Sequence, residues 1–224
     1  MESTSLNLVA ITIFVMMLSA LLGPIFHLSP FIPAGTTLGI LGLMTLDTLS
    51  WKGKGLTLLL DFFASAEDRQ RIIHHEAGHF LAAYCLGIPI NDYTLSAWEA
   101  IKKGQPGIGC VQFNDTFLAE QKILETPLII ERFSTVLMSG IAAEIVIYGQ
   151  ANGGEEDRQN LRELMIVSGI NQNHYQTKAN WSILQAKNLI IRNQETYEEL
   201  VKMMEKRQSV ADCYQLLQEK LKQN

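Results

Sequence analysis

The N-terminal part of the chain carries almost no charge, and this restricts its fold more than any other feature of the sequence. From Ser3 to Leu46 there is no Asp, Glu, Lys or Arg. Residues 6–28 form an apolar run that is long enough to cross a hydrocarbon core of about 30 Å as a helix. Residues 31–49 form a second, shorter apolar segment. The sequence therefore predicts one transmembrane helix and a second one that pairs with it as a hairpin.

The charges that follow the apolar region predict the orientation of the chain. Every Lys and Arg lies after this region, beginning with Lys52 and Lys54. By the positive-inside rule, they place the following domain on the cytoplasmic, or stromal-equivalent, side of the membrane. A cleaved signal peptide is the alternative, but it needs a basic start, and here the charged residue before the run is Glu2. We expect an integral membrane protein with an anchor at 1–50 and a second domain at 51–224.

Composition argues against several other classes of protein. The net charge is −5, and no basic run interleaved with aromatic residues occurs, so we expect no nucleic-acid partner. The three cysteines are widely spaced and form neither a CxxC metal site nor a disulfide framework. We interpret them as ordinary core or surface residues.

The remaining chain predicts a mainly α-helical domain with a small β-hairpin or sheet. Residues 65–87 are typical of one helix, with Ser65 at the start of a capping box. Residues 90–115 contain two alternating segments around the turn-forming sequence KKGQPG. Residues 127–149 predict a strongly apolar buried helix. From about Lys178 the pattern predicts two or three amphipathic helices.

The strongest chemical signal is the HExxH motif within the first predicted helix. His75 and His79 are four residues apart, so they lie on the same helix face and can bind one Zn²⁺ at about 2.0–2.1 Å. Glu76 follows the first histidine and can act as a general base, because Zn²⁺ lowers the pKa of a bound water to about 7. Peptide-bond hydrolysis is the reaction that this pattern most often serves. His74 points about 100° away from this face, so we do not expect it to bind the metal.

A catalytic zinc needs a third protein ligand and an open position. His174 lies in a polar segment and Glu99 at a predicted hairpin tip, and neither has further support as a ligand. Glu144, inside an apolar helix, is expected to orient a ligand or an arginine. The remaining candidates are the acidic residues after a glycine-rich loop, Glu155, Glu156 and Asp157. Residue chemistry alone leaves these three equally plausible.

Three separated motifs resemble the peptidase domain of the FtsH family of membrane-bound zinc proteases. They are HHEAGHFLAAYCLG, SGIAAEIVIYG (139–149) and ANGGEED (151–157), and they occur in the family's order within about residues 66–218. The resemblance implies a helical metallopeptidase domain with one catalytic Zn²⁺. It implies three ligands to that ion, His75, His79 and Asp157. Glu76 would then be the catalytic base of a metalloendopeptidase.

The resemblance also implies partners. Protein or peptide substrates and the lipid bilayer are expected, together with further copies of the chain or ATPase-bearing FtsH-type subunits. No GxxxxGK[ST] pattern occurs, so we expect no ATP site in this chain. One alternative is a catalytically silent FtsH-like assembly subunit. Another is a site-2-type intramembrane metalloprotease, although the charged sequence AEDRQR before the motif is unfavourable inside a membrane.

Overall fold

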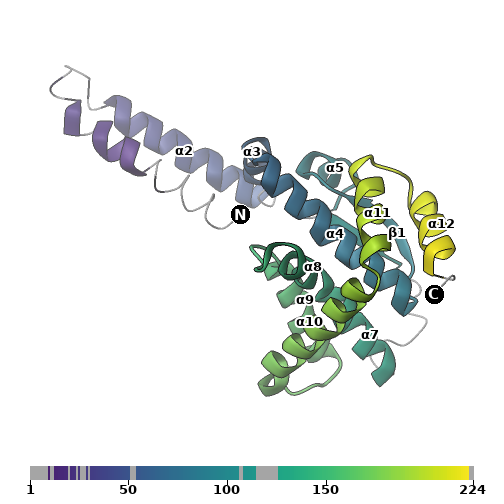
Figure 1. The fold of residues 1–224 in the computed structure, drawn as a ribbon. Helices are drawn as coiled ribbons and strands as arrows, with labels where there is room; N and C mark the ends of the chain where they lie inside the picture. Colours follow the sequence, from purple (N-terminus) through teal and green to yellow (C-terminus); the bar gives the residue numbers. More distant parts are fainter. Residues whose placement is uncertain are drawn as a thin grey trace.

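The computed structural model describes residues 10, 13–19, 21–23, 25, 29, 31–50, 54–105, 108–114 and 126–221. This part of the chain is mainly helical and contains a two-stranded antiparallel sheet, as predicted (Figure 1). The helices are α2 (Phe31–Ser50), α3 (Lys54–Phe62), α4 (Ala66–Leu86), α5 (Ala97–Lys102), α7 (Pro127–Leu137), α8 (Ser139–Tyr148), α9 (Glu155–Val167), α10 (Tyr175–Arg192), α11 (Gln194–Glu205) and α12 (Val210–Leu221). The strands are β1 (Ile90–Thr94) and β2 (Cys110–Phe113), and a short 3-10 helix spans Gln172–His174.

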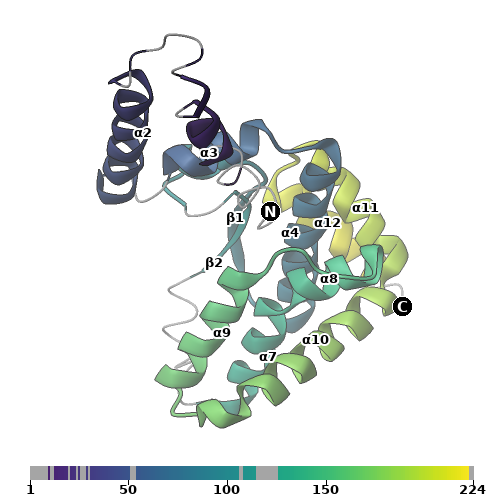
Figure 2. The ribbon, with the colours of Figure 1, turned by 90° about the vertical axis from the view of Figure 1, so that its left-hand side faces the viewer.

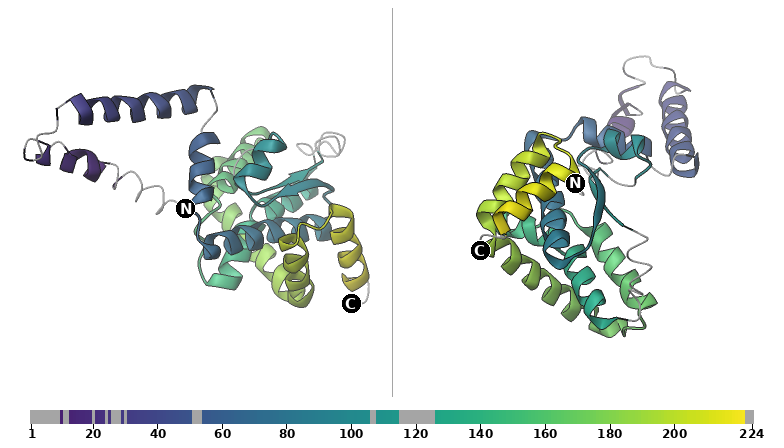
Figure 3. Two further views of the ribbon diagram at one scale, coloured as in Figure 1. Left: turned by 90° about the horizontal axis from the view of Figure 1, so that it is seen from above. Right: turned by 90° about the vertical axis from the view of Figure 1, so that its right-hand side faces the viewer.

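Helix α2 projects away from the body formed by the later helices (Figures 1 and 3). It covers the segment 31–49, which is helical throughout, as expected. Among the described residues, however, no helix combines the length and the apolar character needed to cross a membrane. The first predicted span, 6–28, lies largely outside the described residues.

Helix α4 begins and ends where the sequence predicts. The Ser65 hydroxyl accepts a hydrogen bond from the Asp68 N–H at 3.1 Å, and the Ser65 N–H donates to the Asp68 carboxylate at 3.1 Å. This capping box satisfies N–H groups that a helix start leaves unpaired. At the other end Gly87 adopts a left-handed conformation with φ 74°, which suits glycine. The predicted helix 65–87 is confirmed.

The predicted hairpin is confirmed in its strands but wrong at its tip. Strands β1 and β2 pair antiparallel, with Tyr93 opposite Val111. Between them, Ala97–Lys102 forms helix α5, where a simple turn was expected. The cause is local, because the Ser96 side chain accepts the Glu99 N–H at 3.2 Å and so caps a helix.

The apolar segment 127–149 forms two helices, so the prediction of one continuous helix is wrong. The break is at Met138, where φ is −90° and ψ is 0°. The Ser139 hydroxyl donates to the Val136 carbonyl at 2.5 Å, which satisfies a carbonyl at the end of α7. The break lets α8 take its own direction across α4 (Figure 2).

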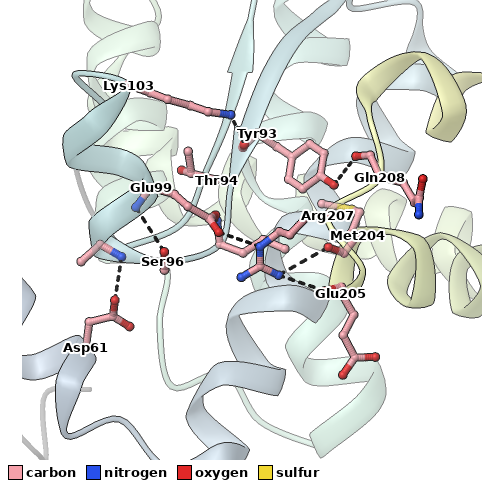
Figure 4. Close-up of polar contacts among 12 residues, drawn as sticks. Asp61, Tyr93, Thr94, Ser96, Glu99, Lys103, Met204, Glu205, Arg207 and Gln208 are labelled. Atoms are coloured by element: carbon pink, nitrogen blue, oxygen red, sulfur yellow. Dashed lines mark hydrogen bonds and ion pairs between the residues drawn. The ribbon is translucent and has the colours of Figure 1, made fainter.

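The C-terminal region forms three helices, α10 to α12, as predicted. Arg207, in the turn between α11 and α12, has a left-handed backbone with φ 57°, which is uncommon outside glycine. Its Nε donates to Glu99 Oε1 at 2.7 Å, and the Tyr93 hydroxyl donates to the Gln208 carbonyl at 2.5 Å (Figure 4). These bonds attach the turn to β1 and α5.

Helix α4 packs tightly against α8 at Gly78. A Cβ atom at this position would lie 2.5 Å from the Ser139 carbonyl oxygen and 2.7 Å from the Ala143 Cβ. Neither atom can retreat without moving α8. The glycine inside the HExxH motif therefore has a packing role that the motif itself does not reveal.

We predict that Gly78→Ala destabilises the protein by about 1–3 kcal/mol, the cost of overpacking a filled core. Helix propensity alone would give the opposite sign, since Ala is favoured over Gly in a helix by about 0.5–1 kcal/mol. Thermal unfolding should show a fall of about 2–4 °C per kcal/mol. Gly39→Ala in α2 is the control, because a Cβ there meets nothing within 4 Å. A higher melting temperature for Gly78→Ala would contradict the close contact.

Candidate metal centre

Three of the predicted site residues come together at one point. His75 and His79 project from successive turns of α4, and Asp157 lies in the first turn of α9. Asp157 Oδ2 is 2.9 Å from His75 Nε2, and Asp157 Oδ1 is 3.3 Å from His79 Nε2. One ligand atom from each residue lies within 4.8 Å of the others. This group could hold a metal ion.

Hydrogen bonds on the far side of each ring decide which nitrogen faces the common point. His75 Nδ1 is 2.8 Å from Glu144 Oε1, and His79 Nδ1 is 2.8 Å from the Val136 carbonyl oxygen. A carboxylate and a carbonyl only accept hydrogen bonds, so both Nδ1 atoms donate. In a neutral ring the Nε2 atom then carries a lone pair, as a metal ligand requires.

The hydrogen bonds of the His75 ring also indicate whether a cation fits between His75 and Asp157. With Nδ1 protonated, the His75 Nε2 lone pair faces a carboxylate oxygen of Asp157 at 2.9 Å. Two acceptors at that distance repel each other unless a proton or a metal ion lies between them. The donor set of two imidazoles and one carboxylate therefore fits a divalent cation.

Glu144 connects His75 to the loop that leads to Asp157 at the start of α9. Its Oε1 accepts a hydrogen bond from His75 Nδ1, and its Oε2 accepts one from the Asn152 N–H at 2.9 Å. The Glu144 side chain is 4% exposed, and Arg71 Nη1 lies 3.7 Å from its Oε2. Burial raises the pKa of Glu144, but the bonds to His75 and Asn152 and the charge of Arg71 lower it overall. Glu144 therefore holds the ring of His75, a member of the group that could bind a metal.

Two glycines make room for the cluster. A Cβ at Gly140 would lie 2.3 Å from His75 Nε2 and 2.5 Å from His79 Nε2. Gly154 has φ 91°, and a Cβ there would lie 2.2 Å from Ile141 Cγ1. Gly140 thus leaves open the space beside both ligand nitrogens, and Gly154 lets the loop turn into α9.

Asp157 and the two histidines shift one another's pKa because their charges are opposite. Burial would raise the pKa of Asp157, but the charges of His79 and His75 hold it well below its usual range. Burial lowers the pKa of His75, yet the Asp157 carboxylate raises it well above its ordinary value. A bound cation would take the place of the protons that these histidines otherwise hold, so protons and metal compete for the site.

Glu76 lies in the same pocket but outside the ligand cluster. It is 5% exposed, and a Cβ at Gly109 would lie 2.7 Å from its Oε1. Burial raises the pKa of Glu76 to about 7, although the charges of His75 and His79 oppose this rise. A cation at the cluster would lower it again. A lower pKa leaves the Glu76 carboxylate ionised at neutral pH, so it can accept a proton there.

The cluster opens into a pocket of about 400 Å³. Ile108, Val111 and Phe113 line one side of it, so the strand β2 and the residues before it form an apolar wall. Leu137 from α7 and Ile72 from α4 add to this wall. The site thus combines a polar floor with an apolar wall that can contact a side chain of a bound molecule.

The other candidates lie elsewhere or play other parts. Glu99 accepts bonds from the Leu95 N–H and the Arg207 guanidinium, and His174 is exposed at the end of the 3-10 helix. Glu155 pairs with Arg162, and Glu156 lines the pocket without joining the cluster. None of these belongs to the group that could hold a metal.

His74 contacts two tyrosines and lies outside the cluster. Its Nδ1 lies 3.0 Å from the Tyr197 hydroxyl, and its ring packs edge to face with Tyr148. Burial lowers the pKa of His74, which favours a neutral ring. It joins α4 to α11, as expected for a histidine outside the ligand face.

Sequence reasoning missed several residues that support the site. The Val136 carbonyl orients His79, and the guanidinium of Arg71 lies 4.0 Å from the centre of the Tyr148 ring, beside Glu144. Neither has a signal in the sequence, because a carbonyl has no residue type and Arg71 is one of several charges before the motif. Gly140 could have been suspected, since a glycine inside a buried helix often marks a close approach.

Comparison with known proteins gives no match, either to a protein-family model or to a curated protein. The evidence for a function therefore lies in the geometry of the site and in the sequence motifs that form it.

We predict that Asp157→Asn weakens Zn²⁺ binding by about 10-fold or more, as loss of a metal-site partner typically does. The amide lacks the charge that balances the cation. Glu99→Gln, an equally small change in α5, should leave Zn²⁺ affinity unchanged. Competition titration with a chromophoric chelator measures both. Equal affinities in the two variants would remove Asp157 from the ligand set.

A second prediction concerns the open space at Gly140. Gly140→Ala places a methyl group among the ligand nitrogens, so we expect at least about a 10-fold loss of Zn²⁺ affinity. Circular dichroism shows whether the variant keeps its helical fold, because the same methyl group also crowds the crossing of α4 and α8. Unchanged affinity in the folded variant would mean that the metal is bound away from these nitrogens.

Proposed function

We propose that this protein is a membrane-anchored zinc metalloendopeptidase of the FtsH type. One observation carries the proposal: His75, His79 and Asp157 converge on one point, beside the buried carboxylate of Glu76. The HExxH motif supplies two ligands and a base from a single helix, and a separate helix supplies the third ligand. Three protein ligands leave a position for water or substrate, as in catalytic rather than structural zinc sites.

Zinc fits both this donor set and the HExxH motif that supplies two of its members. Imidazole nitrogen suits Zn²⁺, Cu²⁺, Fe²⁺ and Ni²⁺, whereas Mg²⁺ and Ca²⁺ prefer oxygen ligands. Two imidazoles with one carboxylate are the ligand types of hydrolytic zinc enzymes. His75, His79 and Asp157 would hold the ion.

Each residue around the proposed ion has a separate role in hydrolysis. A bound Zn²⁺ would supply a Lewis acid that lowers the pKa of water to about 7 and polarises the scissile carbonyl. Glu76 accepts a proton from the attacking water as the oxygen bonds to the carbonyl carbon. Glu76 then returns that proton to the amide nitrogen as the C–N bond breaks. Glu144 holds the His75 ring in the tautomer that this geometry needs.

The pocket supports a polypeptide as the substrate. Its apolar wall is built by the segment that runs into β2, and among the described residues β2 pairs only with β1. An extended peptide that bonded to the other edge of β2 as an added strand would lie along this wall. The wall then contacts alternate side chains of that peptide.

The exposed apolar side chains of helix α2 are evidence for a membrane anchor. Along α2, Phe31, Leu38, Leu43 and Leu49 are each more than two-thirds exposed. A water-soluble protein rarely exposes so many large apolar groups together. A lipid environment would cover them. The positions of Lys52 and Lys54 then favour a peptidase domain on the cytoplasmic or stromal-equivalent side.

Likeness to the FtsH peptidase domain in three motifs supports further partners. This chain would act with ATPase-bearing FtsH-type subunits, or with further copies of itself, when its substrates need unfolding. The charged first turn of α4, with Glu67 and Asp68, disfavours an intramembrane protease.

We predict that Glu76→Gln keeps Zn²⁺ binding and the fold but loses cleavage of casein and oxidised insulin B chain. General acid–base groups contribute about 10²–10⁴-fold, so the loss should be of that size. Glu99→Gln is the matched control and should cleave like the natural chain. Retained cleavage in Glu76→Gln would place the base elsewhere. A zinc-loaded natural chain that cleaves nothing would favour the silent assembly subunit.

A further inference from the structure

Large apolar side chains are exposed where the N-terminal helices join the domain. Phe62, the last residue of α3, is 77% exposed, and Phe63 is 59% exposed. Their rings meet edge to face at 5.2 Å. Leu59, one turn earlier, is 47% exposed. Among the residues that the structure describes, neighbouring side chains leave about half or more of each of these three groups exposed.

A third exposed aromatic residue lies on the adjacent helix. Helices α3 and α5 are in contact, and Asp61 accepts the Ala97 N–H at 2.9 Å (Figure 4). Trp98, the next residue of α5, is 56% exposed. Phe62 and Trp98 are therefore each next in sequence to a residue of the hydrogen bond that joins α3 to α5. We refer to the exposed residues Leu59, Phe62, Phe63, Trp98 and Lys102 as the α3–α5 face.

The chemistry of this face is that of a membrane–water boundary. The Lys102 ammonium lies 5.1 Å from the centre of the Trp98 ring. Tryptophan has an apolar body with one N–H donor, and it is enriched at the level of the lipid headgroups. Lysine can lay its apolar stem along such a surface while its ammonium reaches anionic headgroups.

The α3–α5 face is continuous with the apolar N-terminal helix. The Gly55 N–H donates to Asp47 Oδ1 at 2.8 Å, which fastens the start of α3 to the last turns of α2. Figure 1 shows α3 between the inner end of α2 and helix α5. A lipid environment that covers α2 therefore reaches α3 and α5 next. This continuity favours lipid over a protein partner.

We infer that the α3–α5 face rests on the bilayer surface, at the boundary between headgroups and acyl chains. This inference rests on the proposed membrane anchor and adds a second contact, made by the domain itself. Thr57 of α3 also lines the metal pocket. With α3 on the bilayer, the pocket borders a helix that contacts the membrane. The substrate class is then polypeptide that emerges from the bilayer beside the protein.

Tryptophan fluorescence tests this contact directly, because the chain contains three tryptophans, Trp51, Trp98 and Trp181. The full-length W51F/W181F variant keeps Trp98 alone. The W51F/W98F variant keeps Trp181 on α10, which is 53% exposed and so matches Trp98 in exposure. Both are reconstituted in vesicles of phosphatidylcholine and phosphatidylglycerol, with the phosphatidylcholine brominated near the headgroup end of one acyl chain. Bromine should quench Trp98 several-fold more strongly than Trp181.

Co-flotation with the same vesicles reports the anchor separately. Protein that floats with the vesicles but shows equal quenching of the two tryptophans overturns the bilayer contact and leaves the anchor intact. A protein partner on this face would give that same result. Protein that does not float overturns the anchor and the contact together. As a second variant, F62S/F63S in the Trp98 background should float normally but lose much of the quenching, and unchanged quenching would count against the face as defined.

Discussion

The close crossing of α4 and α8 is the constraint on which the rest of the site depends. It is possible because Gly78 on α4 and Gly140 on α8 present no side chain at the contact. A Cβ at either glycine would lie within 2.5 Å of an atom of the other helix. Repulsion at such distances is steep, so the two glycines set the separation of the helices. That separation places His75 and His79 against α8 and leaves space beside their Nε2 atoms.

A buried carboxylate extends this local geometry to a second element. Glu144 on α8 accepts hydrogen bonds from His75 on α4 and from the Asn152 N–H in the loop before α9. A charge buried to this extent is tolerated when several donors surround it, and Arg71 adds a nearby positive charge. One side chain thus couples the orientation of a ligand ring to the position of the loop. Because Asp157 follows that loop, its distance from the histidines is determined by the same contact.

Much of the fold was predictable because its signals are local. Ser65 and Gly87 mark the ends of α4, and the antiparallel strand pair follows from alternating residues around a turn. The helix at α5 was missed although a signal existed, since Ser96 and Glu99 have the spacing of a capping box. The break at Met138 was missed because nothing local marks it. An apolar sequence that continues across a bend looks the same as one that continues along a helix.

The sequence by itself determined the HExxH geometry, because residues four apart on a helix share a face whatever the surrounding fold. It therefore placed His75 and His79 together, with Glu76 beside them. Residue chemistry left the third ligand open among several acidic residues, and only the resemblance pointed to one of them. Tertiary structure decided that Asp157 reaches the histidines while Glu156 and Glu99 do not. The physical reason is that the meeting of residues 82 positions apart depends on helix crossing and loop conformation, which short-range periodicity does not encode.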